Sequence, residues 1–184
     1  MVNREEINNL SSEIIEKAKG IKLFFLDVDG VMTDGSIYLN EMGESVKKFN
    51  SLDGYGIKLL QDAGIEPVVI TGRNSKAIRN RCTELQITKA YYGIQNKLQI
   101  ADQYLDSSGF NWSEAAGMGD DWPDLPILMR VKLSFSPPQA HKEVLSRVNY
   151  VCTASAGMGA VREACDLLIM AKGNYTTVLN QMLM

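Results

Sequence analysis

Short apolar runs alternate with helical patterns along almost the whole chain, and this alternation constrains the fold more than any other feature. The apolar runs lie at residues 21–28, 66–71, 89–92, 114–118, 132–135 and 149–152. Stretches with apolar residues three or four apart separate most of them, at 54–63, 75–85, 96–107, 123–130 and 139–147, and two more at 159–170 and 175–183 end the chain. This pattern predicts an α/β fold, a doubly wound, Rossmann-like parallel sheet flanked by helices.

We expect one domain over residues 1–184, because a chain of this length can bury a sufficient core without disulfide bonds. Residues 1–19 have apolar side chains three or four apart and precede a glycine, which predicts an amphipathic helix. Residues 35–50 break the alternation. Two short runs there flank residues 40–43, which predicts a β-hairpin that lies as a flap over the carboxyl edge of the sheet.

The charge balance excludes several classes of partner. The chain has 19 Lys and Arg against 22 Asp and Glu, a net charge of −3, and no basic cluster, so we expect neither nucleic acid nor membrane as a partner. No run approaches the roughly 18 apolar residues of a membrane span, and the charged N-terminus is unlike a leader peptide, which predicts a cytoplasmic protein. Cys82, Cys152 and Cys165 lack a paired spacing and are expected to be buried, reduced thiols.

Acidic residues follow the first apolar run at its carboxyl end. Asp27 and Asp29 lie two residues apart in extended chain, so their side chains point to the same side, and Gly30 permits a sharp turn after them. Residues of this kind also end strands through turn hydrogen bonds. The motif alone therefore leaves a catalytic and a structural interpretation open.

A second acidic group, Asp120, Asp121 and Asp124, follows a later apolar run. Such a group repels itself unless a cation lies within it, although helix N-capping and a solvated acidic loop are alternatives. Carboxylate oxygens from Asp27 and Asp120 suit Mg²⁺. Zinc is not expected, because His141 is the only histidine and no cysteine is near the acids.

Other polar groups follow neighbouring runs. Thr71 and Arg73 come at the end of the second run and Lys97 after the third, so a parallel sheet would bring them to the same edge as the acids. Singly, a threonine at a strand end is usually a cap and a lysine in the first turn of a helix is usually solvated. Taken together with the acids, they indicate a functional site.

The order of these groups resembles the four motifs of the haloacid dehalogenase superfamily of aspartate-nucleophile phosphotransferases. The motifs are an apolar strand ending in DxDGV, a second ending in TGR, a lysine, and GDDxxD. Within the superfamily, the chain resembles the 3-deoxy-D-manno-octulosonate 8-phosphate (Kdo-8-phosphate) phosphatase family of lipopolysaccharide sugar synthesis, over about residues 20–175. The residues that carry this resemblance are 27–35, 49–57, 70–73, 119–121 and 157–163. A receiver domain uses similar groups, but its acid pair precedes its phosphorylated aspartate, the reverse of the order here.

The resemblance implies catalysis through an aspartyl-phosphate intermediate. Asp27 would attack the phosphorus, and Asp29 would be first the general acid and then the general base. For the first step Asp29 must carry a proton, which neighbouring negative charge would favour. The resemblance assigns Mg²⁺ to the Asp27 carboxylate, the Asp29 main-chain carbonyl and Asp120.

The remaining groups of the motifs have supporting roles by the same resemblance. Thr71 and Lys97 would bind phosphoryl oxygens, and Asp121 would orient Lys97 or a metal-bound water. Asp124 is expected to support these groups or to cap a helix.

The family's substrate contacts fall on residues that can bind a sugar acid through hydrogen bonds or charge. They are Asp29, Asn50, Ser51, Leu52, Asp53, Gly54, Lys58, Arg73, Arg81 and Lys97. The intervals between the motifs leave no room for a cap domain, so the resemblance implies an uncapped site, covered by a neighbouring subunit of a homotetramer. The hairpin is the expected contact, while the tail at 173–184 fits either a neighbour's site or ordinary helix packing.

Three functions remain open. The first is a Mg²⁺-dependent phosphatase for Kdo-8-phosphate, and the second a phosphatase for a nine-carbon ulosonate 9-phosphate or another sugar phosphate. The third is a non-catalytic phosphosugar sensor, which would not need the acid group of Asp29. A phosphomutase is not expected, because it needs a cap. Met158 stands where a basic residue is expected between two glycines, which leaves the identity of the sugar open.

Overall fold

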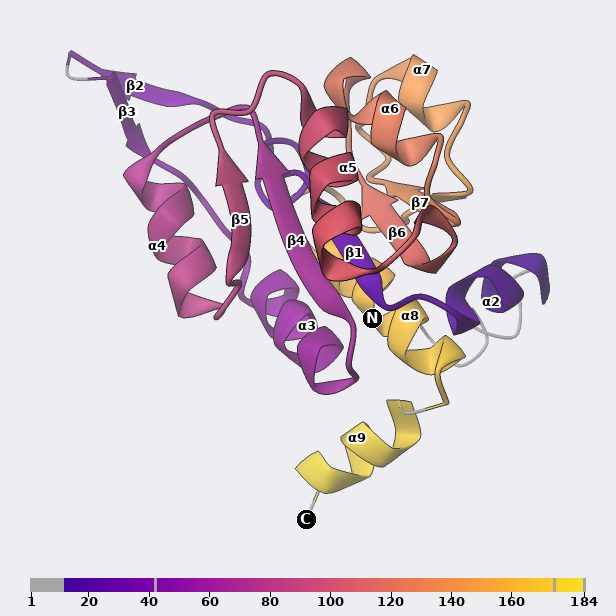
Figure 1. Ribbon diagram of the computed structural model, residues 1–184. Helices are drawn as coiled ribbons and strands as arrows, with labels where there is room; N and C mark the ends of the chain where they lie inside the picture. Colours follow the sequence, from indigo (N-terminus) through magenta and orange to yellow (C-terminus); the bar gives the residue numbers. More distant parts are fainter. Residues whose placement is uncertain (1–11, 42, 174, 184) are drawn as a thin grey trace.

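A parallel sheet positions all the other parts of the protein. The computed structural model describes residues 12–41, 43–173 and 175–183, and Figure 1 shows its ribbon. Within these ranges six parallel strands pair in the order β5-β4-β1-β6-β7-β8. The strands are β1 Leu23–Leu26, β4 Glu66–Thr71, β5 Lys89–Tyr92, β6 Ala115–Met118, β7 Leu133–Ser136 and β8 Tyr150–Val151. The predicted doubly wound sheet is confirmed.

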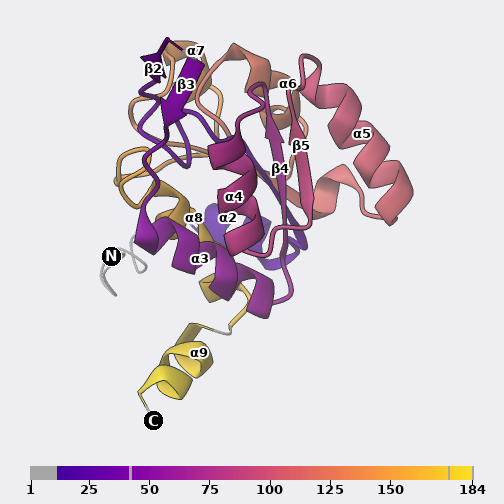
Figure 2. The same ribbon diagram turned by 90° about the vertical axis from the view of Figure 1, so that its left-hand side faces the viewer.

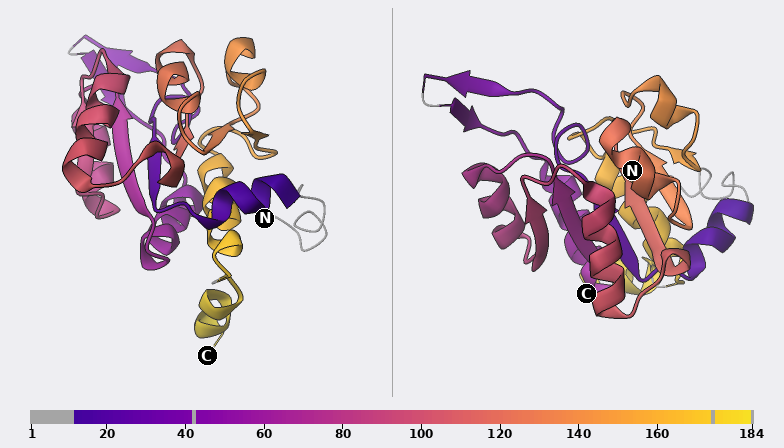
Figure 3. Two further views of the ribbon diagram at one scale, coloured as in Figure 1. Left: turned by 45° about the vertical axis from the view of Figure 1, so that its right-hand side comes forward. Right: turned by 45° about the horizontal axis from the view of Figure 1, so that its top comes forward.

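Helices cover both faces of the sheet, because its central strands are apolar on both sides. Along β1, Phe24 and Leu26 pack on the side of α3 and α8, whereas Leu23 and Phe25 pack on the side of α5 (Figures 1 and 3). The helices are α2 Ser12–Lys19, α3 Ser51–Asp62, α4 Lys76–Glu84, α5 Lys97–Ser108, α6 Leu125–Leu128, α7 Lys142–Leu145, α8 Ala160–Ala171 and α9 Tyr175–Met182, with 3-10 turns η1 Trp112–Glu114 and η2 Trp122–Asp124.

The connections diverge on the two sides of β1. From β1 the chain runs through α3 to β4 and through α4 to β5, and then crosses back through α5 to β6. β1 and β6 are therefore adjacent strands at a topological switch point, where sheets of this kind bind ligands beyond their carboxyl ends. These carboxyl ends lie at the top of Figure 1.

The shortest helices differ most from the sequence prediction. The stretch at 123–130 divides into η2 and the four-residue α6, since Pro123 and Pro126 donate no backbone hydrogen bond. The stretch at 139–147 forms only α7, which follows Pro137 and Pro138.

Helix α3 begins three residues before its predicted start. The side chain of Asn50 accepts hydrogen bonds from the backbone N–H groups of Leu52 (2.8 Å) and Asp53 (3.4 Å) and so caps the helix. The predicted N-terminal helix is present as α2, and its part in residues 1–11 lies outside the described residues.

A two-stranded hairpin follows β1. Its strands, β2 Tyr38–Asn40 and β3 Gly43–Val46, pair antiparallel and project from the carboxyl edge of the sheet (Figures 1 and 3). The apolar side chains of Tyr38, Leu39 and Val46 are exposed on it. The hairpin lies where the sequence predicts one, and its role as a flap stays a prediction.

The two ends of the molecule differ in character. Helix α9 extends from the end opposite the hairpin (Figure 2), where Tyr175 and Val178 pack against the core.

The three cysteines are free and buried, as predicted. In the part of the chain that the structure describes, no helix has the length and apolar character that crossing a membrane requires.

The loop between β8 and α8 depends on a glycine. Gly157 has φ of +60° and donates its N–H to the carbonyl of Val31 (3.1 Å). A Cβ at this position would lie 2.6 Å from the carbonyl carbon of Thr33 and 2.7 Å from the amide nitrogen of Asp34. Neither backbone atom can move without displacing the turn that follows β1.

We expect Gly157→Ala to destabilise the protein more than Gly64→Ala, a control with φ of +74° and no atom within 4 Å of the added Cβ. The left-handed conformation alone costs about 1–2 kcal/mol, and the clash adds about 1–3 kcal/mol. Thermal unfolding should therefore show a melting temperature several degrees lower for Gly157→Ala, since 1 kcal/mol corresponds to about 2–4 °C at this size. Equal losses would contradict the close contact.

Candidate active site

Neighbouring strand ends deliver polar side chains to one cavity. Asp27 follows β1, Asp120 follows β6 and Thr71 ends β4. The backbone N–H of Asp27 donates to the carbonyl of Met118 (3.1 Å), which continues the β1–β6 pairing up to the site. The cavity has a volume of about 430 Å³ and is lined by Asp27, Asp29, Gly30, Gly35, Ile37, Thr71, Gly72, Arg73, Ile94, Gln95, Lys97, Asp120, Asp121, Pro123 and Asp124. All the predicted catalytic and metal-binding residues are in this set.

Lys97 is the buried cation of the cavity. It begins α5, and its Nζ lies 2.8 Å from Oδ1 of Asp27 and 2.6 Å from Oδ1 of Asp124. Burial lowers the pKa of Lys97, but the carboxylates of Asp27 and Asp124 outweigh this effect and raise the pKa above its ordinary value. Lys97 therefore stays charged between two acids.

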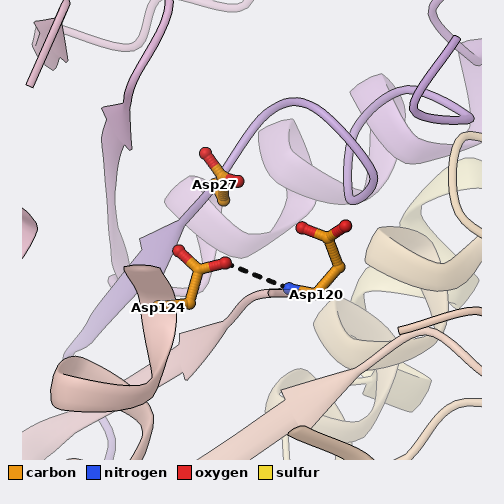
Figure 4. Close-up of side chains that lie close together, drawn as sticks. All are labelled: Asp27, Asp120 and Asp124. Carbon is orange, nitrogen blue, oxygen red and sulfur yellow. Dashed lines mark hydrogen bonds between the residues drawn. The ribbon is translucent and has the colours of Figure 1, made fainter. Parts of the chain in front are cut away.

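Asp124 occupies the position that the sequence analysis gave to Asp121. Its Oδ1 accepts from Lys97. Its Oδ2 accepts from the backbone N–H of Asp120 (3.1 Å), as Figure 4 shows, and from that of Asp121 (3.3 Å). Asp121 is exposed, and among the described residues it forms no ion pair with Lys97. The prediction that Asp121 orients Lys97 is thus not supported, because the η2 turn brings Asp124 back beneath the loop. The expectation that Asp124 supports its neighbours agrees with these bonds.

Three carboxylates face the same space (Figure 4). One oxygen from each of Asp27, Asp120 and Asp124 lies within 4.8 Å of the others. Three carboxylates against the single ammonium of Lys97 leave an excess of two negative charges. A divalent cation with a preference for oxygen ligands fits this donor set and this charge.

The acids hold their protons unusually tightly. Burial raises the pKa of Asp27 to about 7, and the neighbouring charge of Asp124 contributes to the rise. Burial, together with the charges of Asp27 and Asp124, raises the pKa of Asp120 to about 7 as well. Gly30 lies directly against Asp120, since a Cβ there would lie 2.1 Å from its Oδ2.

Asp29 faces cations rather than acids. Nζ of Lys47 donates to its Oδ1, and Nε of Arg73 lies 3.8 Å from its Oδ2. The ion pairs of Asp29 are therefore with positive charge, while Asp27 and Asp120 line the same cavity.

Lys47 is the residue of the site that the sequence analysis missed. Its spacing from the motifs gives no signal, because it lies in a Lys47-Lys48 pair on the hairpin that resembles a solvated surface. Only the return of the chain from β3 brings it against Asp29.

Most of the predicted substrate-binding residues lie apart from this cavity. Arg73 and Lys97 line it with Asp29, whereas a second depression of about 160 Å³ is lined by Ser51, Gly54, Tyr55, Lys58, Arg81, Glu84 and Leu85. Within it, Arg81 donates to the carbonyl of Asn50 (2.9 Å) and to the Glu84 carboxylate (2.8 Å). Leu52 is exposed, and Asn50 is engaged in capping α3. A single chain thus does not bring the two sets together.

The buried side chain of Asp53 is engaged within the chain. Its Oδ1 accepts from the N–H of Arg162 (2.9 Å) and its Oδ2 from the N–H of Gly159 (3.3 Å), so it caps the start of α8 from α3. Its predicted contact with substrate stays a prediction. Met158, in the same loop, is exposed and does not line the cavity.

Comparison with known proteins decides the family. No family model matches the chain. The chain is 41% identical over 172 residues to the 3-deoxy-D-manno-octulosonate 8-phosphate phosphatase KdsC of Escherichia coli (strain K12), and the match covers 94% of this chain and 92% of that protein. The chain belongs to the Kdo-8-phosphate phosphatase family. The resemblance predicted from the motifs is confirmed, and so is the haloacid dehalogenase fold.

Solved structures of this family agree in fold. The phosphatase of Moraxella catarrhalis, crystallised with magnesium ion, phosphate ion and a KDO molecule, superimposes with a TM-score of 0.91 at 35% identity, covering 94% of this chain and 99% of that one. The cobalt-bound phosphatase of Haemophilus influenzae superimposes with a TM-score of 0.85 at 35% identity, covering 88% and 94%.

The raised pKa values of Asp27 and Asp120 predict how stability depends on pH. In the unfolded chain these carboxyl groups titrate near 3.8, so the folded state binds more protons between that pH and about 7. The resulting stability is fully present at low pH and is lost as the pH rises through about 7. With a chelator, we expect the melting temperature to fall between pH 5.5 and 8, and Mg²⁺ to reduce this fall because it favours the ionised carboxylates.

The matched variant is Asp120→Asn, which removes one of the two titrating groups. We expect a shallower fall of melting temperature with pH in chelator, by at least the 2–4 °C that about 1 kcal/mol produces in a chain of this size. It should also weaken the stabilisation by Mg²⁺. An unchanged slope in Asp120→Asn would contradict the assignment.

Proposed function

We propose that this protein hydrolyses Kdo-8-phosphate to Kdo and phosphate through an aspartyl-phosphate on Asp27. The observation that carries the proposal is the meeting of Asp27, Thr71, Lys97 and Asp120 in one cavity at the switch point of the sheet. The family membership supports the same reaction. A cytoplasmic location and a single domain over residues 1–184 belong to this proposal.

Asp27 is the nucleophile of the proposed reaction. Its carboxylate attacks the phosphorus in line with the sugar oxygen, and the P–O bond to the sugar breaks as the aspartyl-phosphate forms. Lys97 lies 2.8 Å from Asp27, where its ammonium group can neutralise the charge that develops on the phosphoryl oxygens. Thr71 supplies a hydroxyl group from the adjacent strand end.

Asp29 transfers the proton in the proposed reaction. Its carboxyl group gives a proton to the departing sugar oxygen and later takes one from the water that attacks the aspartyl-phosphate. It lies two residues after the nucleophile and lines the same cavity. In this proposal Asp29 acts on the leaving-group side of the in-line attack by Asp27.

Mg²⁺ is the proposed cofactor. Asp27, Asp120 and the main-chain carbonyl of Asp29 would hold it, and when bound it supplies positive charge to the transferring phosphoryl group. Asp124 would support this arrangement through its bonds to Lys97 and to the N–H of Asp120, and Asp121 would act on a metal-bound water.

A homotetramer completes the proposed site. The exposed apolar residues of the hairpin support a subunit contact, since exposed apolar patches often mark interfaces between proteins. The basic depression with Lys58 and Arg81 shares no residue with the acidic cavity of its own chain. We infer that this depression, with Asn50 to Gly54 at its edge, binds the sugar acid in the cavity of a neighbouring subunit.

Asp27→Asn tests the nucleophile. We expect loss of phosphate release on the order of 10⁴-fold or more, as for removal of other nucleophiles, with a melting temperature no lower than that of the wild type, because Lys97 keeps its bond to Asp124. Phosphate release is measured with Kdo-8-phosphate, a nine-carbon ulosonate 9-phosphate and other sugar phosphates, each with Mg²⁺ and with chelator. Preference for another sugar phosphate would assign a different substrate to the same mechanism. Retained activity in Asp27→Asn would contradict the mechanism.

Mixing inactive variants tests the neighbouring-subunit proposal. Asp27→Asn and Arg81→Ala, refolded together, should release more phosphate than the sum of the two alone, because mixed oligomers contain sites with an intact Asp27 and an intact Arg81. Asp27→Asn with Lys97→Ala is the control and should show no recovery, since these residues contact each other within one chain. No recovery in either mixture would place all substrate contacts in a single chain.

A further inference from the structure

The hairpin contributes one buried charge to the active site. The side chain of Lys47 is 1% exposed, although it directly follows the exposed Val46 and precedes Lys48, whose side chain is 54% exposed. Its ammonium group donates to Oδ1 of Asp29, whereas Lys48 pairs with Asp34 at the surface. Burying a lysine is unfavourable unless its charge is paired, so the contact with Asp29 helps to define where this side chain lies.

The two oxygens of Asp29 have different surroundings. Oδ1 is held by Lys47, and Oδ2 lies on the side of Arg73, whose Nε is 3.8 Å away. Oδ1 can accept a hydrogen bond from Lys47 whether or not Oδ2 carries a proton. The bond therefore fixes the orientation of the carboxyl group and leaves one oxygen available to the cavity.

We propose that Lys47 is a positioning residue for proton transfer to the leaving group, which holds Asp29 so that its Oδ2 meets the departing sugar oxygen. This inference rests on the proposed function. In the step it assists, the P–O bond to the sugar breaks, the proton moves from the Asp29 carboxyl group to the sugar oxygen, and the phosphoryl group passes to Asp27. The attacking water later returns a proton to Asp29, and Lys47 keeps its protons throughout.

The leaving group separates this role from a structural one. A sugar alkoxide is a strong base and leaves slowly without a proton, whereas the nitrophenolate of p-nitrophenyl phosphate is stable without one. Loss of correct orientation at Asp29 should therefore slow release of the sugar far more than release of nitrophenolate. Hydrolysis of the aspartyl-phosphate also uses Asp29 and is common to both substrates, so the two are compared in a single turnover, which reports the first step alone. General damage to the site, or damage to Asp27 or Lys97, would slow both substrates alike.

The test compares Lys47→Met, Lys47→Arg and the matched control Lys48→Met on Kdo-8-phosphate and on p-nitrophenyl phosphate, with Mg²⁺ present. For Lys47→Met in a single turnover with excess enzyme, we expect release of Kdo to slow by about 10²-fold, within the range of acid–base contributions. Release of nitrophenolate should slow less than about 5-fold, and the concentration that gives the half-maximal rate should change little for both substrates. Lys47→Arg should recover part of the loss, because it also donates to Oδ1. Lys48→Met should match the wild type on both substrates.

Two results would overturn the inference. Equal losses in single-turnover release of Kdo and of nitrophenolate would show that Lys47 maintains the site in general, and no loss would show that Asp29 keeps its orientation without it. Thermal unfolding of each variant shows whether it folds. If Lys47→Met does not fold, the two substrates are compared in Lys47→Arg, which retains the positive charge. The proposed function fails separately: if Asp27→Asn remains active, or the wild type releases phosphate from no sugar phosphate, the mechanism is wrong irrespective of Lys47.

Discussion

The site depends on one buried ammonium group between two carboxylates. Asp27 and Asp124 approach each other at the ends of different elements only because Lys97 lies between them, 2.8 Å and 2.6 Å from their oxygens. Without it, three acids would share a poorly solvated space, at a cost that raised pKa values could only partly offset. The remaining negative charge suits a divalent cation. Charge balance thus links the fold, the nucleophile and the choice of metal.

The sheet could be predicted from the sequence because parallel strands buried on both faces appear as continuous apolar runs. β4 and β5 begin and end where the runs at 66–71 and 89–92 do. The run at 21–28 is longer than β1, because Asp27 and Val28 continue beyond the sheet edge into the site. The short α6 and α7 were predicted too long, since periodicity does not show where prolines and side-chain caps end a helix.

Sequence spacing located the strand-end groups Asp27, Thr71 and Asp120, because a parallel sheet brings its carboxyl ends to one edge. It could not assign the partner of Lys97, since the choice between Asp121 and Asp124 is made by the backbone path of η2. It also could not find Lys47, whose contact with Asp29 depends on a hairpin that returns across the edge. A contact that forms because the chain turns back on itself leaves no periodic pattern in the sequence.

Within residues 12–41, 43–173 and 175–183 the sheet of the hairpin has two strands, and an isolated two-stranded ribbon is marginally stable in water. The pair of Lys47 and Asp29 stabilises the ribbon at its base, while Tyr38, Leu39 and Val46 are exposed on its outer surface. A partner on that outer surface would reduce the conformational entropy of the ribbon, including that of Lys47. In this way the outer surface of the hairpin, which touches no substrate, can lower the entropic part of the activation free energy for the reaction in the cavity.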